Sequence, residues 1–166
     1  MIHYRYILPT LSTCLLILMA TCGVIYLSGC SSDSPEDQVR SFIKTAEDAV
    51  EKNEIGDVKA MISENYSDND GMTKKDIIAY LSYQLLRKRS IHLFTSIDQV
   101  KFPAEDQAEV VLFVAMTGQP VESASILPKL QADIYRFDLI LQNIDGNWLL
   151  ATSTWQPALI EDIFTE

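Results

Sequence analysis

The chain has 166 residues, with 13 Lys and Arg against 23 Asp and Glu and a formal net charge of −10. This length suits one ordinary domain and is too short for two. The acidic balance argues against a nucleic-acid-binding protein, because affinity for phosphates depends on clustered Lys and Arg. The composition also fits none of the collagen-like, low-complexity or disulfide-dense classes.

The first 29 residues differ in composition from the rest of the chain. They hold one charged side chain, Arg5, and a largely apolar run at residues 14–27. That run is shorter than the roughly 20 residues of a bilayer-spanning helix and is typical of a secretory signal peptide. It leads into Leu27-Ser28-Gly29-Cys30 and then into a serine-rich segment. These residues resemble the lipobox of bacterial lipoproteins.

The lipobox resemblance implies that residues 1–29 are a signal peptide cleaved before Cys30. It further implies palmitate-type diacylation of the Cys30 thiol and acylation of the new amino terminus, so that Cys30 anchors the protein to a lipid bilayer. Residues 30–34 form a short tether, in which 31–34 reach at most about 14 Å at about 3.5 Å per residue. We therefore expect a cell-envelope location, at the periplasmic face of the outer membrane in an organism with two membranes. An uncleaved anchor helix is the alternative.

The cysteine and histidine counts limit the chemistry of the processed chain. Cys14 and Cys22 lie in the leader and Cys30 carries lipid, which leaves no free thiol for catalysis, zinc binding or a disulfide. One histidine remains, and the Asp68-Asn69-Asp70-Gly71 turn lacks the downstream Glu of a calcium loop. We expect no metal site and no cofactor.

Three helices are predicted in the first half of the processed chain. Ser34 is the expected N-cap of the first helix, with Pro35 at its first position and an apolar stripe at three- and four-residue spacing. Asp57 is expected to cap a shorter second helix. Thr73 and Asp76 form a capping-box variant at the start of the third helix, which the basic triplet 87–89 ends.

Four strands are predicted after the helices. The apolar period changes to two over residues 91–102, where a register slip near 98–100 predicts a bulge. Strands at 108–116, 130–141 and 148–155 follow, joined by a turn at 103–106, a longer loop and a turn at 143–147. The strand at 108–116 is apolar on both faces, so both faces must be covered. Helices followed by antiparallel strands indicate an α+β domain.

The same residues resemble the nuclear transport factor 2-like superfamily, which includes ketosteroid isomerases and polyketide-cyclase-like proteins. The resemblance rests on the capped first helix, the break at residues 53–57, Tyr66 before the third helix, and the closing segment at 146–150. It covers residues 35–156 and leaves a tail at 157–166. It implies a cone-shaped fold in which three helices pack on a curved antiparallel sheet of about four strands.

Enzymes of that superfamily place an Asp or His, and sometimes a Tyr, inside the cone, where burial shifts the pKa. The resemblance makes Asp138 and His92 the candidate bases, with Arg136 as an anchor for an anionic ligand. The alternatives are a surface ion pair between Arg136 and Asp138 and an edge histidine. Five aromatic side chains are candidates for the lining of a pocket, and the alternative is that they pack in the core. They are Tyr80, Tyr83, Tyr135, Trp148 and Trp155.

The sequence favours a non-enzymatic binding or assembly module, because no catalytic set is present and the doubly apolar strand needs cover. That cover is the tail, a second copy of the chain or another envelope protein. The alternatives are a small isomerase- or dehydratase-like enzyme that uses Asp138 or His92, and a carrier of hydrophobic ligands.

Overall fold

The computed structural model describes residues 33–87, 91–130 and 132–164. The chain divides after Asp33, and the unit from Ser34 onward is described by itself. The predicted signal peptide and the lipidation of Cys30 lie outside the described residues. Within the described ranges, no helix combines the length and the apolar composition that a membrane crossing requires.

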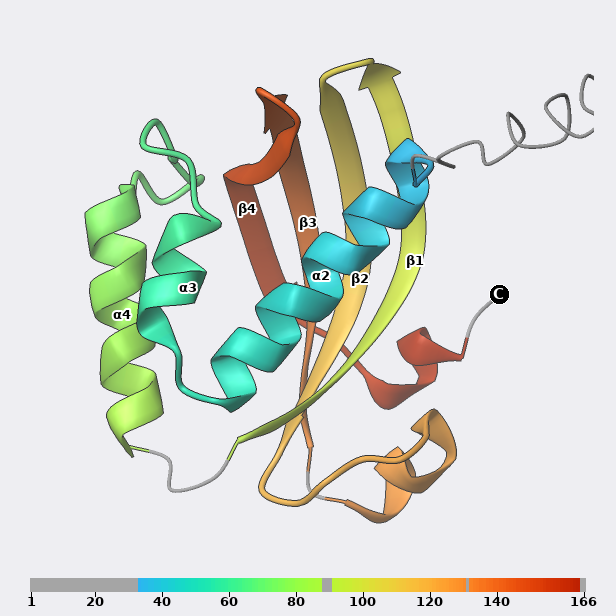
Figure 1. Cartoon of the computed structure of the whole chain (residues 1–166). Helices are drawn as coiled ribbons and strands as arrows, with labels where there is room; N and C mark the ends of the chain where they lie inside the picture. The colour runs from blue at the N-terminus through green and yellow to red at the C-terminus, as the bar shows by residue number, and fades with distance from the viewer. Residues whose placement is uncertain (1–32, 88–90, 131, 165–166) are drawn as a thin grey trace, which may run out of the picture. The chain divides into compact units, whose positions relative to one another are not determined.

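The described residues form helices first and an antiparallel sheet afterwards, as predicted (Figure 1). The helices are α2 (Pro35–Glu51), α3 (Ile55–Ala60) and α4 (Lys74–Arg87), and the strands are β1 (His92–Ala104), β2 (Gln107–Thr117), β3 (Asp133–Ile144) and β4 (Asn147–Pro157). Two short 3₁₀ segments, η2 (Ala124–Lys129) and η3 (Ile160–Ile163), precede β3 and follow β4. The strands lie in the order β1-β2-β3-β4, which confirms the α+β prediction.

Helix α2 begins as the sequence predicts. The Ser34 hydroxyl accepts a hydrogen bond from the Asp37 backbone N–H at 3.1 Å, and Pro35 fills the first helical position. Val39 and Ile43 on one side of the helix are buried against the sheet. Figure 1 shows α2 lying across one face of the strands, so this helix fixes which face becomes the main core.

Helices α3 and α4 lie beside β4, the strand at one edge of the sheet (Figure 1). The prediction that Asp57 caps α3 is wrong: the N-cap is Glu54, and Asp57 lies in the first turn. The capping interaction at α4 is confirmed, since the Asp76 carboxylate accepts from the Thr73 N–H at 3.0 Å and from its hydroxyl at 2.7 Å. These two bonds lower the pKa of Asp76.

The strand bounds differ from the predicted ones at the hairpin ends. The predicted bulge is present between Ile97 and Gln99. Strand β3 begins three residues later than predicted because η2 and its Pro128 occupy the preceding segment. The β3–β4 turn is shorter than predicted, since Asp145 and Gly146 both adopt positive φ angles of 52° and 84°. Two such residues form the tight turn that suits the twist of a hairpin.

The core has two parts. The first lies between α2 and the sheet and includes Val39, Val110 and Leu141, which are almost fully buried. The second lies between α3, α4 and the β4 edge and includes Ile62 and Tyr66. Because side chains alternate along β2, Val110 faces α2, whereas Phe113 and Ala115 face the opposite side of the sheet. Phe113 and Ala115 are buried as well, as the apolar pattern of this strand requires.

Candidate functional site

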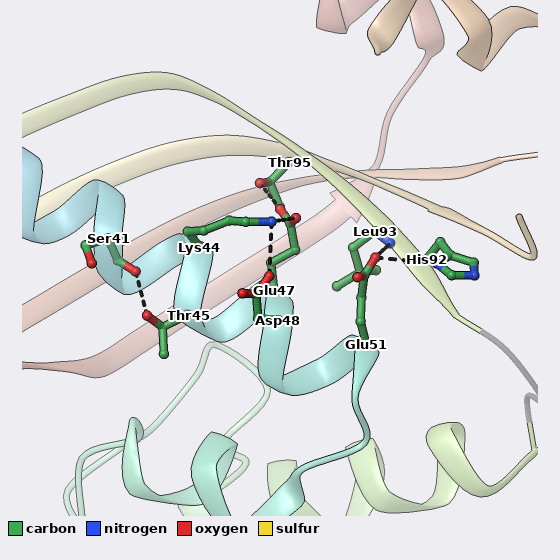
Figure 2. Close-up of polar contacts among 9 residues, drawn as sticks. All are labelled: Ser41, Lys44, Thr45, Glu47, Asp48, Glu51, His92, Leu93 and Thr95. Carbon is green, nitrogen blue, oxygen red and sulfur yellow. Dashed lines mark hydrogen bonds and ion pairs between the residues drawn. The ribbon is translucent and has the colours of Figure 1, made fainter. Parts of the chain in front are cut away.

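The candidate base His92 lies at the start of β1, next to the end of α2 (Figure 2). Its Nδ1 is 3.8 Å from Glu51 Oε1, which also accepts a 2.7 Å hydrogen bond from the Leu93 backbone N–H. The His92 side chain is 30% exposed. The carboxylate of Glu51 therefore joins the end of α2 to the start of the sheet.

Arg136 and Asp138 form an ion pair on β3, with separations of 2.9 and 3.3 Å between the guanidinium and the two carboxylate oxygens. The hydrogen bonds to Asp138 raise the pKa of Arg136. Phe137 and Leu139 pack in the core under α2, so alternation directs Arg136 and Asp138 to the opposite face. Both side chains are about 40% exposed, which matches a surface ion pair.

The structure does not bring the five aromatic candidates together. Tyr80 and Tyr83 are exposed on α4, and Arg87 lies 5.4 Å over the Tyr83 ring. Trp148 is buried under α2, where its indole N–H donates to Gln38 at 3.2 Å. Tyr135 lies at the end of β3 that pairs with Pro157. Trp155 lies on β4, and its ring is 6.3 Å from that of Phe137.

A polar seam joins the middle of α2 to β1 (Figure 2). The Thr95 hydroxyl donates to Glu47 Oε2, and Lys44 Nζ donates to Glu47 Oε1 at 2.5 Å. Lys44 also lies 3.0 Å from Asp48, and its hydrogen bonds to Glu47 and Asp48 raise the pKa of Lys44. Both oxygens of the largely buried Glu47 carboxylate are thus partnered, so this seam is structural.

A hollow of about 230 Å³ lies where the loop between α3 and α4 meets β4. We call it the β4 hollow, and it is lined by Asp68, Asn69, Asp70, Ser153, Thr154 and Trp155. Backbone hydrogen bonds from Ser63 to Leu150 and from Ser67 to Ala151 hold the preceding part of the chain against the edge of β4. The hollow opens just beyond these bonds, where the loop turns back toward α4.

Asp68 is the buried charged side chain of the β4 hollow, with 9% of its surface exposed. Its Oδ1 accepts two backbone N–H groups, from Asp70 at 3.0 Å and from Met72 at 2.8 Å. Its Oδ2 is buried and has no hydrogen-bond partner among the described residues. A buried polar atom without a partner is costly and rare in native proteins, so it points to a ligand.

Tyr66 and Ser153 form a buried hydrogen bond of 2.6 Å behind the β4 hollow. Burial raises the pKa of Tyr66, and the negative charge of Asp68 adds to this shift, whereas the hydrogen bond with Ser153 opposes it. Tyr66 is 2% exposed and does not line the hollow. Its hydroxyl holds the Ser153 side chain in place at the floor.

The sequence does not reveal the β4 hollow. Residues 67–71 are typical of a polar turn and lack the downstream Glu of a calcium loop. The available signal was an acidic loop next to an aromatic residue, Tyr66. The other wall comes from Ser153, which is 87 positions away from Tyr66, and no local pattern links the two.

A second, larger groove of about 360 Å³ lies at the start of α4. Three lysines line it, Lys59, Lys74 and Lys75, together with Glu64, Thr73 and Ile78. Lys74 Nζ donates to the Ile62 carbonyl at 2.6 Å and to Glu64 at 2.8 Å, which lowers the pKa of Glu64. The least exposed lysine is therefore already partnered, whereas one oxygen of Asp68 has no partner among the described residues.

The described residues hold no cluster of three or more His, Cys, Asp or Glu side chains arranged to bind a metal ion. The lining of the β4 hollow carries several oxygen atoms that can accept hydrogen bonds, and among the described residues Asp68 Oδ2 has no partner.

No family model and no curated protein matches the sequence. Solved structures do match. A candidate scytalone dehydratase from Novosphingobium aromaticivorans has a TM-score of 0.62 and 14% identity over 75% of this chain and 84% of that one. A nuclear transport factor 2-like protein of unknown function from Shewanella oneidensis has a TM-score of 0.58 and 15% identity over 74% and 98%. A hexachlorocyclohexane dehydrochlorinase from Novosphingobium barchaimii has a TM-score of 0.58 and 9% identity over 75% and 86%.

These likenesses show that the chain has the nuclear transport factor 2-like fold. The fold predicted from the sequence is therefore confirmed. Proteins with this fold include dehydratases as well as proteins of unknown function, so the fold by itself assigns no activity.

Proposed function

We propose that the protein is a lipid-anchored, non-enzymatic binding module of the cell envelope, and that the β4 hollow is its binding site. The supporting observation is the buried Asp68 Oδ2, which has no hydrogen-bond partner among the described residues and lies in a hollow lined by polar groups. A ligand that donates a hydrogen bond to this oxygen removes the cost of leaving it unpaired.

Binding is favoured over catalysis by the state of the neighbouring groups. A proton-transfer site needs an acid or base that reaches its substrate. The Tyr66 hydroxyl is engaged with Ser153 and buried behind the hollow, and the Arg136–Asp138 pair lies on another face. The hollow is also smaller than the roughly 300–1,000 Å³ of typical pockets for drug-sized ligands.

Carriage of a hydrophobic ligand finds little support in the same geometry. The space between α2 and the sheet is filled by apolar side chains such as Val39 and Leu141, both fully buried. The lining of the β4 hollow is mostly carboxylate, amide and hydroxyl, with one indole from Trp155. Burying these polar groups against an apolar ligand would cost free energy.

Lipid anchoring is tested on the protein in its own cells. We expect Cys30 to carry acyl chains, so intact-mass analysis of the membrane fraction should show a chain that begins at Cys30 with added fatty acids. The variant Cys30→Ser should stay unprocessed and unacylated, with Ser31→Ala as the matched control that is processed normally. An intact, unmodified start methionine on a cytosolic species would overturn the anchoring.

A second candidate function is proton abstraction by Asp68, as in a small isomerase or dehydratase. The observation that favours it is again the unpartnered Oδ2, since a general base needs an acceptor oxygen that no other group already engages, and two similar structures are described as dehydratases. Deuterium uptake from D₂O by a panel of small ketones should then depend on Asp68 and vanish in Asp68→Asn. The binding module predicts no uptake above the buffer rate.

A further inference from the structure

We propose that the β4 hollow binds a primary ammonium group, presented by a small free amine. This inference rests on the proposed function, because it names the class of ligand for the same site. It follows from the charge of the lining, from the single Asp68 oxygen that lacks a partner among the described residues, and from the size of the hollow.

The charge of the lining favours a cation. Of the six lining residues, Asp68 and Asp70 carry carboxylates, and none carries a positive charge. Tyr66, which is hydrogen-bonded to Ser153 behind the hollow, adds no charge, because its raised pKa keeps the hydroxyl neutral at ordinary pH. A negative, largely buried group is most strongly stabilised by a positive partner, because the surrounding protein screens their attraction less than water does.

The unpartnered oxygen of Asp68, Oδ2, favours a primary ammonium group over a guanidinium group. A guanidinium group binds a carboxylate best through both oxygens at once. Asp68 Oδ1 already accepts two backbone N–H groups, so Oδ2 is the one carboxylate oxygen of Asp68 without a partner among the described residues. A primary ammonium is a compact charge that needs a single acceptor for each of its three N–H bonds. It can donate one to Asp68 Oδ2 and another to the hydroxyl oxygen of Ser153, which lines the same hollow.

The available ligands and the size of the hollow both favour an organic cation over a metal ion. A calcium ion takes six to eight oxygen ligands, whereas the described residues show no cluster of three acidic or other metal-binding side chains. About 230 Å³ holds the equivalent of roughly seven waters at about 30 Å³ each. This space accommodates an ammonium group with a short alkyl chain, which can lie against the Trp155 ring.

The experiment uses the full-length protein in detergent micelles with ¹⁵N-labelled tryptophan. The probe is n-butylammonium at pH 7, followed through the two indole N–H signals. Trp155 lines the hollow, while Trp148 lies in the core under α2 and serves as the internal reference. We expect saturable movement of the Trp155 signal and little movement of the Trp148 signal.

The variant Asp68→Asn keeps an oxygen for the N–H groups of Asp70 and Met72 and removes the charge. We expect at least a tenfold loss of butylammonium affinity. The matched control is Asp145→Asn, which makes the same charge change in the exposed β3–β4 turn, at a positive φ that Asn tolerates. Its affinity should stay within about twofold of the wild type.

A comparison of probes tests the inference without relying on any variant. Trimethylbutylammonium has the same charge but no N–H donor, so it should bind the wild-type protein at least tenfold more weakly than butylammonium. Butylguanidinium should also bind more weakly, and butyrate should not bind. Equal binding of the trimethylated probe, preferential binding of butyrate, guanidinium or Ca²⁺, or no binding of butylammonium would each overturn the inference.

These outcomes separate the inference from the proposed function. If butylammonium does not bind but Cys30 is acylated normally, the proposed ligand class is wrong and the proposed lipid anchoring is retained. Deuterium uptake that depends on Asp68 replaces the binding module by an enzyme. An unacylated protein that still binds butylammonium removes the anchor and leaves the ligand class intact.

Discussion

Glu47 and Asp68 are both largely buried carboxylates, yet their surroundings differ. Glu47 lies in the seam between α2 and β1, and both of its oxygens are partnered, by Lys44 and by Thr95 (Figure 2). Asp68 lies at the β4 edge, and one of its oxygens is buried without a partner among the described residues.

The two regions differ in whether every oxygen of the buried carboxylate has a hydrogen-bond partner among the described residues. A buried charge contributes to stability only when its partners are in place, whereas an unpaired one costs free energy that a ligand can recover. The α2–β1 seam is therefore a structural joint. The β4 hollow is the better candidate for binding, and five substitutions test this contrast.

The largest effect is expected in the closed region. Leu141 is fully buried between α2 and the sheet, so Leu141→Ala should lower the free energy of unfolding by about 2–5 kcal/mol, through lost transfer energy and the cavity left behind. Urea unfolding measures this loss. Leu86→Ala makes the same change at a residue that is 82% exposed and should have almost no effect. A loss below about 1 kcal/mol for Leu141→Ala would mean that this region is not closely packed.

The next effect concerns the bond behind the β4 hollow. Tyr66→Phe leaves the buried Ser153 hydroxyl without its partner and should cost about 1–3 kcal/mol. The pKa of Tyr66 is raised in the folded state, so its contribution to stability is complete below about pH 10, the ordinary value for tyrosine, and is lost as pH rises through the folded-state pKa.

The matching measurement is the melting temperature from pH 8 to 11. The wild-type protein should lose more stability above pH 10 than Tyr66→Phe does. Tyr83→Phe, at an exposed tyrosine that accepts a hydrogen bond from Arg87, is the control and should keep the wild-type profile. Parallel profiles for the wild type and Tyr66→Phe would show that Tyr66 does not carry this pH dependence.

The two carboxylates can be compared directly. Glu47→Gln should lower the free energy of unfolding by about 1–2 kcal/mol, because it weakens the bonds to Lys44 and Thr95. Asp68→Asn should change it by less than half as much, since it removes a charge whose second oxygen has no partner among the described residues. Chemical denaturation without added ligand measures both. An equal or larger loss for Asp68→Asn would contradict the contrast between the two regions.

The smallest effect is expected at the Arg136–Asp138 pair. Both side chains are about 40% exposed, so Asp138→Asn should change stability by at most about 0.5 kcal/mol. The difference should shrink further in 0.5 M salt, because screening weakens exposed ion pairs. A loss of several kcal/mol that persists in high salt would show that this pair has a buried structural role.

Much of the secondary structure follows from local chemistry that is visible in the sequence. The capped start of α2 at Ser34, the Thr73–Asp76 interaction at α4 and the bulge after Ile97 depend on residues within a few positions of one another. The hairpin ends are less predictable, since the tight turn at Asp145 and Gly146 depends on positive φ angles that Asn143 and Asn147 on either side also tolerate.

The candidate site shows the opposite behaviour. Arg136 and Asp138 are candidate site residues because they lie two positions apart on one strand. Alternation along β3 directs both side chains away from the core under α2. The sequence determined the order of the elements, the apolar faces and the acidic charge, because these depend on local spacing and composition. Only the tertiary structure decided that Asp68 and Ser153 share one hollow, because that depends on how the loop after α3 lies against the edge of β4.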